Sequence, residues 1–204
     1  MQMTRLLIAT TNKGKLSEYR AMFNELLFRL VTPADEGIME EVEEGDISMA
    51  ENARHKAVHF ANRSKLITVA DDSGLEVDAL GGEPGTRSAR YAGENASDDD
   101  RIIYLLDKLK NIPEEKRTAH FRCVVAVAIP DGKVETFEGE CSGVITFQPR
   151  GENGFGYDPV FYIPELGKTM AELTSETKNR ISHRARAAQR AIPALKRLAE
   201  KVKL

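Results

Sequence analysis

Apolar residues early in the chain occur first as a short run and then at helical spacing. Residues 6–9 read Leu-Leu-Ile-Ala, which predicts a buried strand. Leu16, Tyr19 and Phe23 then fall on one face of a helix. Another apolar run, over residues 28–32, predicts a second strand. The turn between the first strand and the helix therefore lies at a helix N-terminus.

Two more helices have recognisable start signals. Ser48 and Glu51 have the spacing of a capping box, and the helix that follows carries apolar residues such as Phe60 on one face. Ser97 is expected to cap another helix, whose first turn holds three consecutive aspartates at residues 98–100. Acidic side chains in a first turn interact favourably with the helix dipole, so this triplet is not interpreted as a metal site.

The second half of the chain is predicted to contain a long β-hairpin and a C-terminal helix. Strands are expected over residues 119–129 and 134–146, joined by a Pro-Asp-Gly turn. The first of these strands is apolar on both faces, which is typical of a central strand. Residues 174–204 are predicted to be mostly helical, with a kink at Pro193.

Two adjacent carboxylates, Asp71 and Asp72, follow an apolar run over residues 66–70 that predicts a strand. Successive side chains of a strand point to opposite faces, so the two acids are expected to have different roles. One can face a cleft, where a carboxylate suits Mg²⁺, while the other braces the chain. A Ser-Gly pair comes next, and taken alone this stretch favours a turn, with a further strand over residues 75–80.

Charge is distributed unevenly although the formal net charge is only −3. Residues 35–46 contain seven acids and no base, whereas residues 178–203 contain nine Lys or Arg and one acid. These segments are either two solvated faces or an acidic rim that suits a metal and a basic wall that suits an anion. The acidic net charge argues against a nucleic-acid binder that would use the basic C-terminal helix.

Composition indicates a globular protein of 204 residues, long enough for one domain or two small lobes. The sequence has no apolar run long enough to span a membrane, and its start lacks the features of a secretory signal. Cys123 and Cys141 do not form a disulfide framework or a metal-ligand spacing, so reduced core thiols are expected. We therefore expect a cytoplasmic protein that binds no membrane.

Two further stretches have the composition of ligand-binding loops. Residues 10–15 place Thr, Asn, Gly and two Lys at a helix N-terminus, which favours an anion, although an ordinary surface turn is the alternative. Residues 150–158 contain three glycines, which allow close backbone approach to a ligand. Phe155 and Tyr157 alternate with these glycines and suit stacking on a flat base, unless they only cover the core.

Six motifs together resemble the inosine triphosphate pyrophosphatase family. Each motif is weak alone, but they occur in the family's order and span nearly the whole chain. The motifs are Thr10-Thr11-Asn12-Lys13-Gly14-Lys15, Ala70-Asp71-Asp72-Ser73-Gly74-Leu75, Gly81-Gly82-Glu83-Pro84-Gly85, Ser88-Ala89-Arg90-Tyr91, Gly154-Phe155-Gly156-Tyr157-Asp158-Pro159 and Ser182-His183-Arg184.

The resemblance implies a fold, a reaction and partners. The implied fold is α/β, with an elongated mixed sheet flanked by helices and an active-site cleft between two lobes. Residues 1–204 would form a single nucleoside triphosphate pyrophosphatase domain that converts ITP, dITP or XTP to the monophosphate and pyrophosphate. The implied cofactor is Mg²⁺, and the implied assembly is a homodimer. A nucleotide-binding regulator without catalysis is the alternative function.

The resemblance also assigns individual residues. Asp72 would be the catalytic base and a metal ligand together with Glu41, for which Glu44 is the alternative. Asp71 would be either a second metal ligand or a structural brace. The remaining matched positions would bind substrate, and they are Thr10, Thr11, Asn12, Lys13, Gly14, Lys15, Ser73, Phe155, Gly156, Tyr157, Asp158, Lys178, His183 and Arg184.

Within this set, each region has its own expected role. The first strand–helix turn would hold the phosphates, and the two aromatic residues would stack on the base. Asp158, His183 and Arg184 would read the edge of the base. Donors aimed at a 6-oxo group would meet an amino group in ATP, and such a mismatch can cost several powers of ten in specificity.

Overall fold

The computed structural model describes residues 4–40, 42, 45 and 47–201. The chain divides into two compact units. Unit 1 comprises residues 1–72, 123–139 and 184–204, and unit 2 comprises residues 73–122 and 140–183. Each unit is thus assembled from segments that are distant in the sequence.

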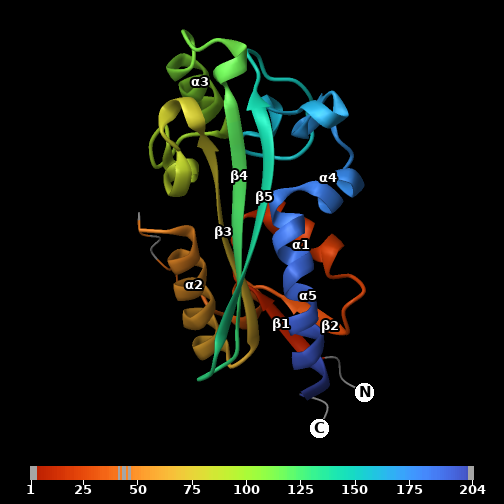
Figure 1. Cartoon of the computed structure of the whole chain (residues 1–204). Coiled ribbons are helices and arrows are strands. Elements are labelled where there is room, and N and C mark those ends of the chain that lie inside the picture. The colour runs from red at the N-terminus through yellow and green to blue at the C-terminus, as the bar shows by residue number, and fades with distance from the viewer. Residues whose placement is uncertain (1–3, 41, 43–44, 46, 202–204) are drawn as a thin grey trace. The chain divides into compact units, whose positions relative to one another are not determined.

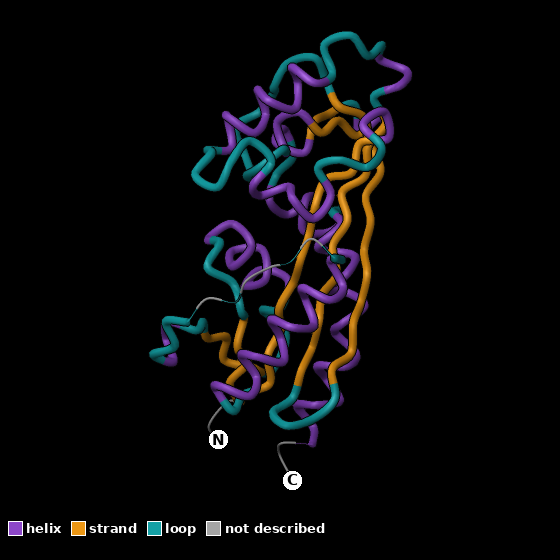
Figure 2. Tube along the Cα trace, turned by 90° about the vertical axis from the view of Figure 1, so that its left-hand side faces the viewer, coloured by secondary structure: helices purple, strands orange, loops and turns teal. Residues whose placement is uncertain are grey.

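Seven strands form one mixed sheet in the order β2-β1-β3-β4-β5-β6-β7. β1 pairs in parallel with β2 and β3, whereas β6 pairs antiparallel with β5 and β7. Figure 2 shows two long strands, β4 and β5, joined at one end by a short loop. The strands are β1 (Thr4–Ile8), β2 (Phe28–Val31), β3 (Ile67–Val77), β4 (Thr118–Ala128), β5 (Val134–Ile145), β6 (Phe161–Ile163) and β7 (Lys168–Thr169).

Five α-helices accompany the sheet in the described residues, so the α/β fold class implied by the resemblance is confirmed. The cap residues expected from the sequence are present, because the Ser48 and Ser97 side chains accept hydrogen bonds from backbone N–H groups three residues later. No helix in the described ranges has both the length and the apolar character needed to cross a membrane. The helices are α1 (Lys13–Met22), α2 (Met49–Ser64), α3 (Asp98–Lys108), α4 (Ser175–Ile181) and α5 (His183–Lys201).

In unit 1 the strands lie between helices, and alternate residues of β1 face opposite layers (Figure 1). Leu6 packs in a cluster with Tyr19 of α1 and Leu195 of α5. Leu7 belongs to a different cluster, which includes Phe60 of α2. This two-residue alternation is the normal consequence of strand geometry, and it leaves β1 buried on both faces.

Unit 2 has its own apolar core. α3 contributes Ile102 and Leu105, which cluster with Phe121 of β4, Ile145 of β5 and Phe161 of β6. The rings of Phe121 and Phe161 lie 4.3 Å apart between centroids. Side-chain packing therefore fixes most of the elements around residues 150–158, the glycine-rich loop.

β3 is one continuous strand, so the turn expected at Asp71 to Gly74 is wrong. Every residue of β3 is buried except Ser73 and Glu76, which are half-buried. A strand between β1 and β4 has ladder partners on both sides, and these outweigh the local turn preference of Asp, Ser and Gly.

The C-terminal helix is also divided differently from the prediction. Ser182 has an extended backbone (φ −64°, ψ 161°), so α4 ends before it and α5 begins after it. Pro193, where a kink was expected, lies inside α5. The break places His183 and Arg184 in the first turn of α5.

Candidate active site

The turn between β1 and α1 has the strand–turn–helix geometry predicted from the sequence. Asn12 is the N-cap of α1, and its side-chain oxygen accepts a hydrogen bond from the Lys15 N–H at 3.0 Å. The Thr10 hydroxyl oxygen accepts one from the Asn12 N–H at 3.2 Å. Thr11, Asn12 and Lys13 are exposed, while Gly14 and Lys15 are half-buried. The helix start is therefore accessible to a ligand, and anion binding there stays a prediction.

Asp71 lies at the centre of a buried charged cluster in unit 1. Its Oδ2 atom is 3.1 Å from Lys15 Nζ and 3.2 Å from Arg184 Nε. Burial alone would raise the pKa of this carboxyl, but the charges of Lys15, Arg184 and Lys56 outweigh burial and hold the pKa well below its usual range. Asp71 is therefore ionised and acts as a brace among cations.

Arg184 completes this cluster. Its Nη1 donates to Glu18 Oε2 at 2.7 Å, and the residue is only 1% exposed. Two carboxylates of unit 1 hold its guanidinium, and the expectation that Arg184 reads the edge of a base stays a prediction. A buried arginine with two ionised partners positions the elements that carry them, here α1 and β3.

Cys123 borders the same cluster as a protonated thiol. Its Sγ lies 3.7 Å from Asp71 Oδ2. Burial, together with the negative charge of Asp71, raises the pKa of the thiol far above its ordinary value. Both Cys123 and Cys141 are buried and free, which confirms the expectation of reduced core thiols.

Asp72 has a different environment from Asp71. It is 4% exposed, and its Oδ2 accepts a hydrogen bond at 2.9 Å from the side-chain amide of Asn52 on α2. The same amide group donates to the Gly45 carbonyl at 2.8 Å, and the Gly45 N–H donates to Asn52 Oδ1. Asn52 thus links Asp72 to Gly45, which belongs to the acidic segment over residues 35–46.

The predicted metal ligands are only partly covered by the structure. Glu41 and Glu44 lie outside the described residues. Within the described ranges, no group of three or more His, Cys, Asp or Glu side chains is arranged to hold a metal. The donor chemistry nevertheless fits a hard cation, because Asn52 links the Asp72 carboxylate to the Gly45 backbone and hard cations prefer oxygen ligands.

In unit 2, the glycine-rich loop is organised around Asp158. Its Oδ2 accepts a hydrogen bond from the Phe155 N–H at 2.9 Å and forms a close ion pair with Lys178 of α4. Lys178 Nζ also lies 4.6 Å from the centroid of the half-buried Phe155 ring. The loop amide, the carboxylate and the ammonium together orient the aromatic ring.

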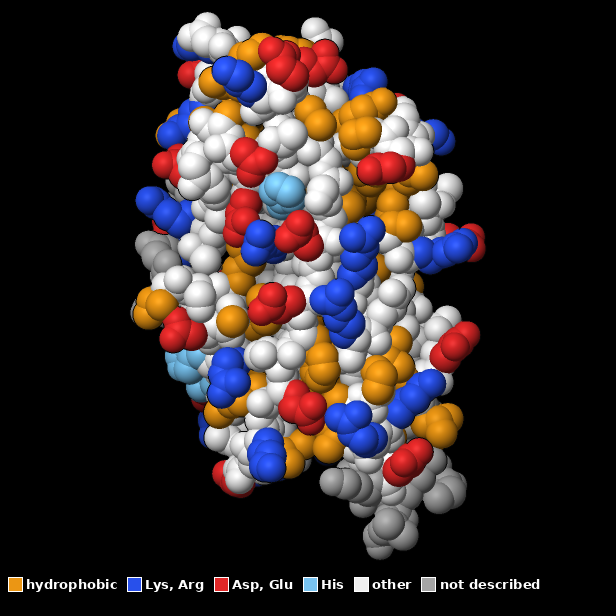
Figure 3. Space-filling model, in the orientation of Figure 1, with side chains coloured by type: hydrophobic (Ala, Val, Ile, Leu, Met, Phe, Trp, Pro, Cys, Tyr) orange, Lys and Arg blue, Asp and Glu red, His pale blue; other side chains and the backbone are white. Residues whose placement is uncertain are grey.

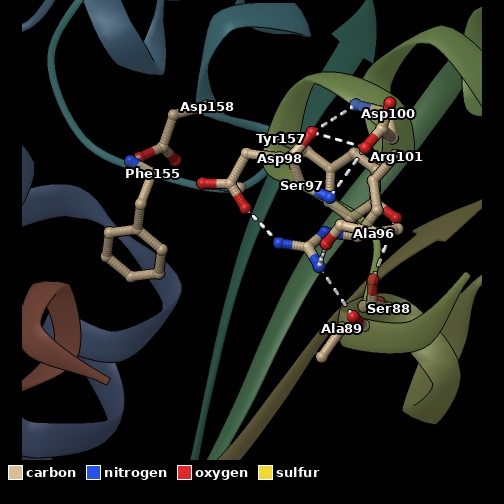
Figure 4. Close-up of polar contacts among 11 residues, drawn as sticks. Ser88, Ala89, Ala96, Ser97, Asp98, Asp100, Arg101, Phe155, Tyr157 and Asp158 are labelled. Atoms are coloured by element: carbon tan, nitrogen blue, oxygen red, sulfur yellow. Dashed lines mark hydrogen bonds and ion pairs between the residues drawn. The ribbon is translucent and has the colours of Figure 1, made fainter. Parts of the chain in front are cut away.

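Tyr157 is held by contacts within unit 2, and stacking of its ring on a base stays a prediction. The side chain is 4% exposed within the core of unit 2, and its hydroxyl donates to the Ser88 carbonyl at 3.0 Å (Figure 4). Burial raises the pKa of this phenol, so the hydroxyl stays a donor. Stacking on a base remains a prediction for both Phe155 and Tyr157.

His183 is buried against an aromatic ring of unit 2, and Ser73 lies next to Asp72 in β3. The His183 ring is buried and stacks on Phe121, with centroids 4.7 Å apart and planes 17° apart. Ser73 directly follows Asp72 on β3 and is half-buried. Gly156 has a φ of +61°, a conformation that glycine adopts without strain.

Comparison with known proteins identifies the family. The model of the Ham1 family matches residues 6–194. The chain belongs to the Ham1 family. The resemblance inferred from the six motifs is thereby confirmed.

Relatives in this family are similar over most of their length. The dITP/XTP pyrophosphatase of Geobacter sulfurreducens is 54% identical over 91% of this chain and 93% of its own. The dITP/XTP pyrophosphatase of Bacillus subtilis is 48% identical over 90% and 92%. The Ham1 protein structure from Staphylococcus aureus has a TM-score of 0.81 and 42% identity, and it covers 97% of this chain and 99% of its own.

Sequence reasoning missed three residues of the Ham1-family site. Glu18 pairs with Arg184, Asn52 holds Asp72, and Lys56 lowers the pKa of Asp71. The available signal was periodicity: Asn52 and Lys56 are four apart on α2, so they share one helix face. By sequence pattern alone, such polar side chains cannot be told from a solvated helix face, and the tertiary fold places them near β3.

Proposed function

We propose that this chain hydrolyses non-standard purine nucleoside triphosphates (ITP, dITP and XTP) to the monophosphate and pyrophosphate. The observation that carries the proposal is the division of labour between Asp71 and Asp72. Asp71 is ion-paired with cations, whereas Asp72 is held by the neutral amide of Asn52. Relatives named dITP/XTP pyrophosphatase, at 48% and 54% identity, support the substrate class.

The phosphates would be held by the turn between β1 and α1. Thr10, Asn12 and Lys15 supply a hydroxyl, the first N–H groups of a helix and an ammonium group. Lys56, whose charge already acts on Asp71, adds a further cation in unit 1. Thr11, Lys13, Gly14 and Ser73 complete the set proposed to contact the triphosphate.

We propose Mg²⁺ as the metal, held by Asp72 and Glu41, with Glu44 as the alternative to Glu41. The Asn52 amide bonds to both Asp72 and Gly45, which supports a cation shared between Asp72 and the acidic segment. When bound, the ion would neutralise phosphate charge and lower the pKa of a water.

Asp72 is proposed as the base that takes a proton from the attacking water. A carboxylate with an ordinary pKa of roughly 4 is a weak base, so the water must itself be acidified. The bond that breaks joins the α- and β-phosphates, and pyrophosphate leaves. Asn52 fixes the Asp72 carboxylate for this transfer through its 2.9 Å hydrogen bond.

Base recognition is assigned to unit 2. Phe155 stacks on the purine beside Gly156, Asp158 reads the edge of the base, and Lys178 adds a further polar contact. The contacts of Asp158 and Lys178 with Phe155 support this placement. His183 is the donor aimed at the 6-oxo group, which an amino group replaces in ATP. Tyr157 is proposed to stack on the base and Arg184 to read its edge, and their contacts with Ser88 and Glu18 hold the two side chains in place.

The reaction is tested by separating products from ITP, dITP, XTP, GTP and ATP with and without Mg²⁺. We expect pyrophosphate from ITP, dITP and XTP when metal is present, and little from ATP. Asp72→Asn should lower turnover by a factor of about 10²–10⁴, which is the usual contribution of a general base. Release of orthophosphate, or unchanged turnover in this variant, would contradict the mechanism. Binding without turnover would instead indicate a nucleotide-binding regulator.

We also propose that the protein acts as a homodimer on the cytoplasmic nucleotide pool. The family resemblance supports this assembly. Light scattering should give twice the mass of the chain, and a mass equal to one chain would contradict the dimer.

A further inference from the structure

The three aspartates at the start of α3 make different contacts, although the sequence suggested one shared role. Asp100 is part of the capping box with Ser97. The exposed Asp99 side chain makes no hydrogen bond or ion pair with another residue that the structure describes. Asp98 Oδ2 accepts a hydrogen bond at 2.6 Å from the N–H of Gly156, which lies 58 residues away. Helix-dipole stabilisation alone does not explain this long-range contact.

The Asp98 carboxylate is itself held in place. Its other oxygen forms a close ion pair with Arg101. Arg101 Nη1 donates to the carbonyls of Ala89 and Ala96, both at 2.8 Å. Figure 4 shows Asp98 between Arg101 and the loop that carries Phe155. Both carboxylate oxygens are therefore occupied, and Arg101 is anchored to backbone.

The glycine-rich loop is consequently fixed by two carboxylates from different parts of unit 2. Asp158 accepts from the Phe155 N–H at 2.9 Å, and Asp98 accepts from the next N–H, that of Gly156. Gly154 and Gly156 have positive φ angles of 81° and 61°. Ordering residues of a free loop costs backbone conformational entropy. A loop that is already fixed before binding avoids that cost when the base stacks.

We propose that Asp98 is a positioning residue for base recognition, acting through the Gly156 N–H on the orientation of Phe155. This inference rests on the proposed function, because it names how the same loop is preorganised for a purine. Asp98 does not touch substrate and takes no part in proton transfer. Removing it should weaken binding of the base and leave the chemical step intact.

The kinetic test compares Asp98→Ala and Asp98→Asn with the matched control Asp99→Asn, which changes the same charge in the same helical turn. In Asp98→Ala, the loss of a hydrogen bond to a charged group should raise KM for ITP on the order of tenfold. The kcat of this variant should stay within about twofold of wild type. Asp98→Asn keeps an acceptor for Gly156 and should lie between wild type and Asp98→Ala. Asp99→Asn should match wild type. An unchanged KM in Asp98→Ala, or equal losses at both positions, would overturn the proposal.

A second measurement does not depend on turnover. Hydrogen–deuterium exchange of peptides containing residues 155–157 should be faster in Asp98→Ala and unchanged in Asp99→Asn. If Asp98→Ala does not fold, Asp98→Asn carries both measurements. If wild type releases no pyrophosphate from ITP, the proposed function fails, while exchange still tests the contact. If wild type is active but exchange and KM are unaffected at position 98, only the positioning role fails.

Discussion

At the scale of single residues, neighbours in the sequence have separate chemical environments. Asp71 and Asp72 are adjacent on β3, yet one is ion-paired with Lys15 and Arg184 and the other is hydrogen-bonded to Asn52. Alternation along a strand produces this separation, because each side chain faces a different helix layer. The role that the sequence left open for Asp71 is therefore that of a brace.

Asp71→Asn should destabilise the protein by about 3–5 kcal/mol at neutral pH, because it leaves buried cations without their partner. The ion pairs depress the pKa of Asp71 in the folded state, so its contribution is present above the unfolded pKa of about 4. That contribution is lost as the pH falls below about 4. Urea unfolding at pH 7 and pH 3 should show a smaller loss of stability in the variant than in wild type. Asp99→Asn is the control, and equal pH dependence in Asp71→Asn and wild type would argue against the brace.

Gly154 and Gly156 provide a matched pair for testing the glycine-rich loop. Both have positive φ, but a Cβ at Gly154 would lie 2.0 Å from Asp158 Oδ2, whereas a Cβ at Gly156 would meet nothing within 4 Å. Gly154→Ala should therefore lower the thermal unfolding midpoint more than Gly156→Ala, which carries backbone strain alone. Equal midpoints would mean that Asp158 and Lys178 can move aside at no cost.

At the scale of elements, helix starts position functional side chains. Ser48 caps α2, whose next turns carry Asn52 and Lys56, and Asn12 caps α1 beside Lys15. Ser182 separates α4 from α5, so that His183 and Arg184 begin a helix. The site is therefore built largely from first and second helical turns, where a cap sets the direction of the chain.

Ser48→Ala should cost about 1 kcal/mol of stability, because the Glu51 N–H loses its acceptor at 3.1 Å. Ser48→Gly should cost only a few tenths of a kcal/mol, since glycine is tolerated at an N-cap. Thermal unfolding of the two variants tests this order. The cap has no energetic importance if both variants match wild type.

At the scale of the whole molecule, charges of both signs are interspersed on the face shown in Figure 3. The basic residues of α5 are partly engaged within unit 1, because Arg190 donates to the Glu138 carbonyl at 2.6 Å and Arg197 pairs with Glu135 at 3.4 Å. These contacts favour the interpretation of the basic segment as a partnered helix face over that of a nucleic-acid surface.

Binding should stabilise the molecule in proportion to substrate preference. Asp72→Asn is used because its slow turnover should leave ITP intact during the measurement. At a hundredfold excess over Kd, ITP with Mg²⁺ should stabilise this variant by about 2.7 kcal/mol and so raise its thermal unfolding midpoint. ATP should produce a smaller shift, and chelation of Mg²⁺ should reduce both shifts. Equal shifts for ITP and ATP would contradict selection at the 6-position.

The sequence by itself determined the features that depend on local hydrogen bonds and periodicity. The caps at Asn12, Ser48 and Ser97, the hairpin turn between β4 and β5 and most element positions follow from interactions within a few residues. The family motifs added the fold class and the predicted roles of the candidate site residues. Anion binding by the first turn and metal binding by Glu41 stay predictions.

Only the tertiary structure decided what those positions do. Arg184 meets Asp71 and Glu18 across 113 and 166 residues of sequence, and the Tyr157 hydroxyl meets Ser88 across 69. Burial and ion pairing depend on what packs opposite a side chain, and no local pattern contains that information. The same reason explains why β3 continues through a turn-like sequence, and why one aspartate of three at the start of α3 contacts the glycine-rich loop.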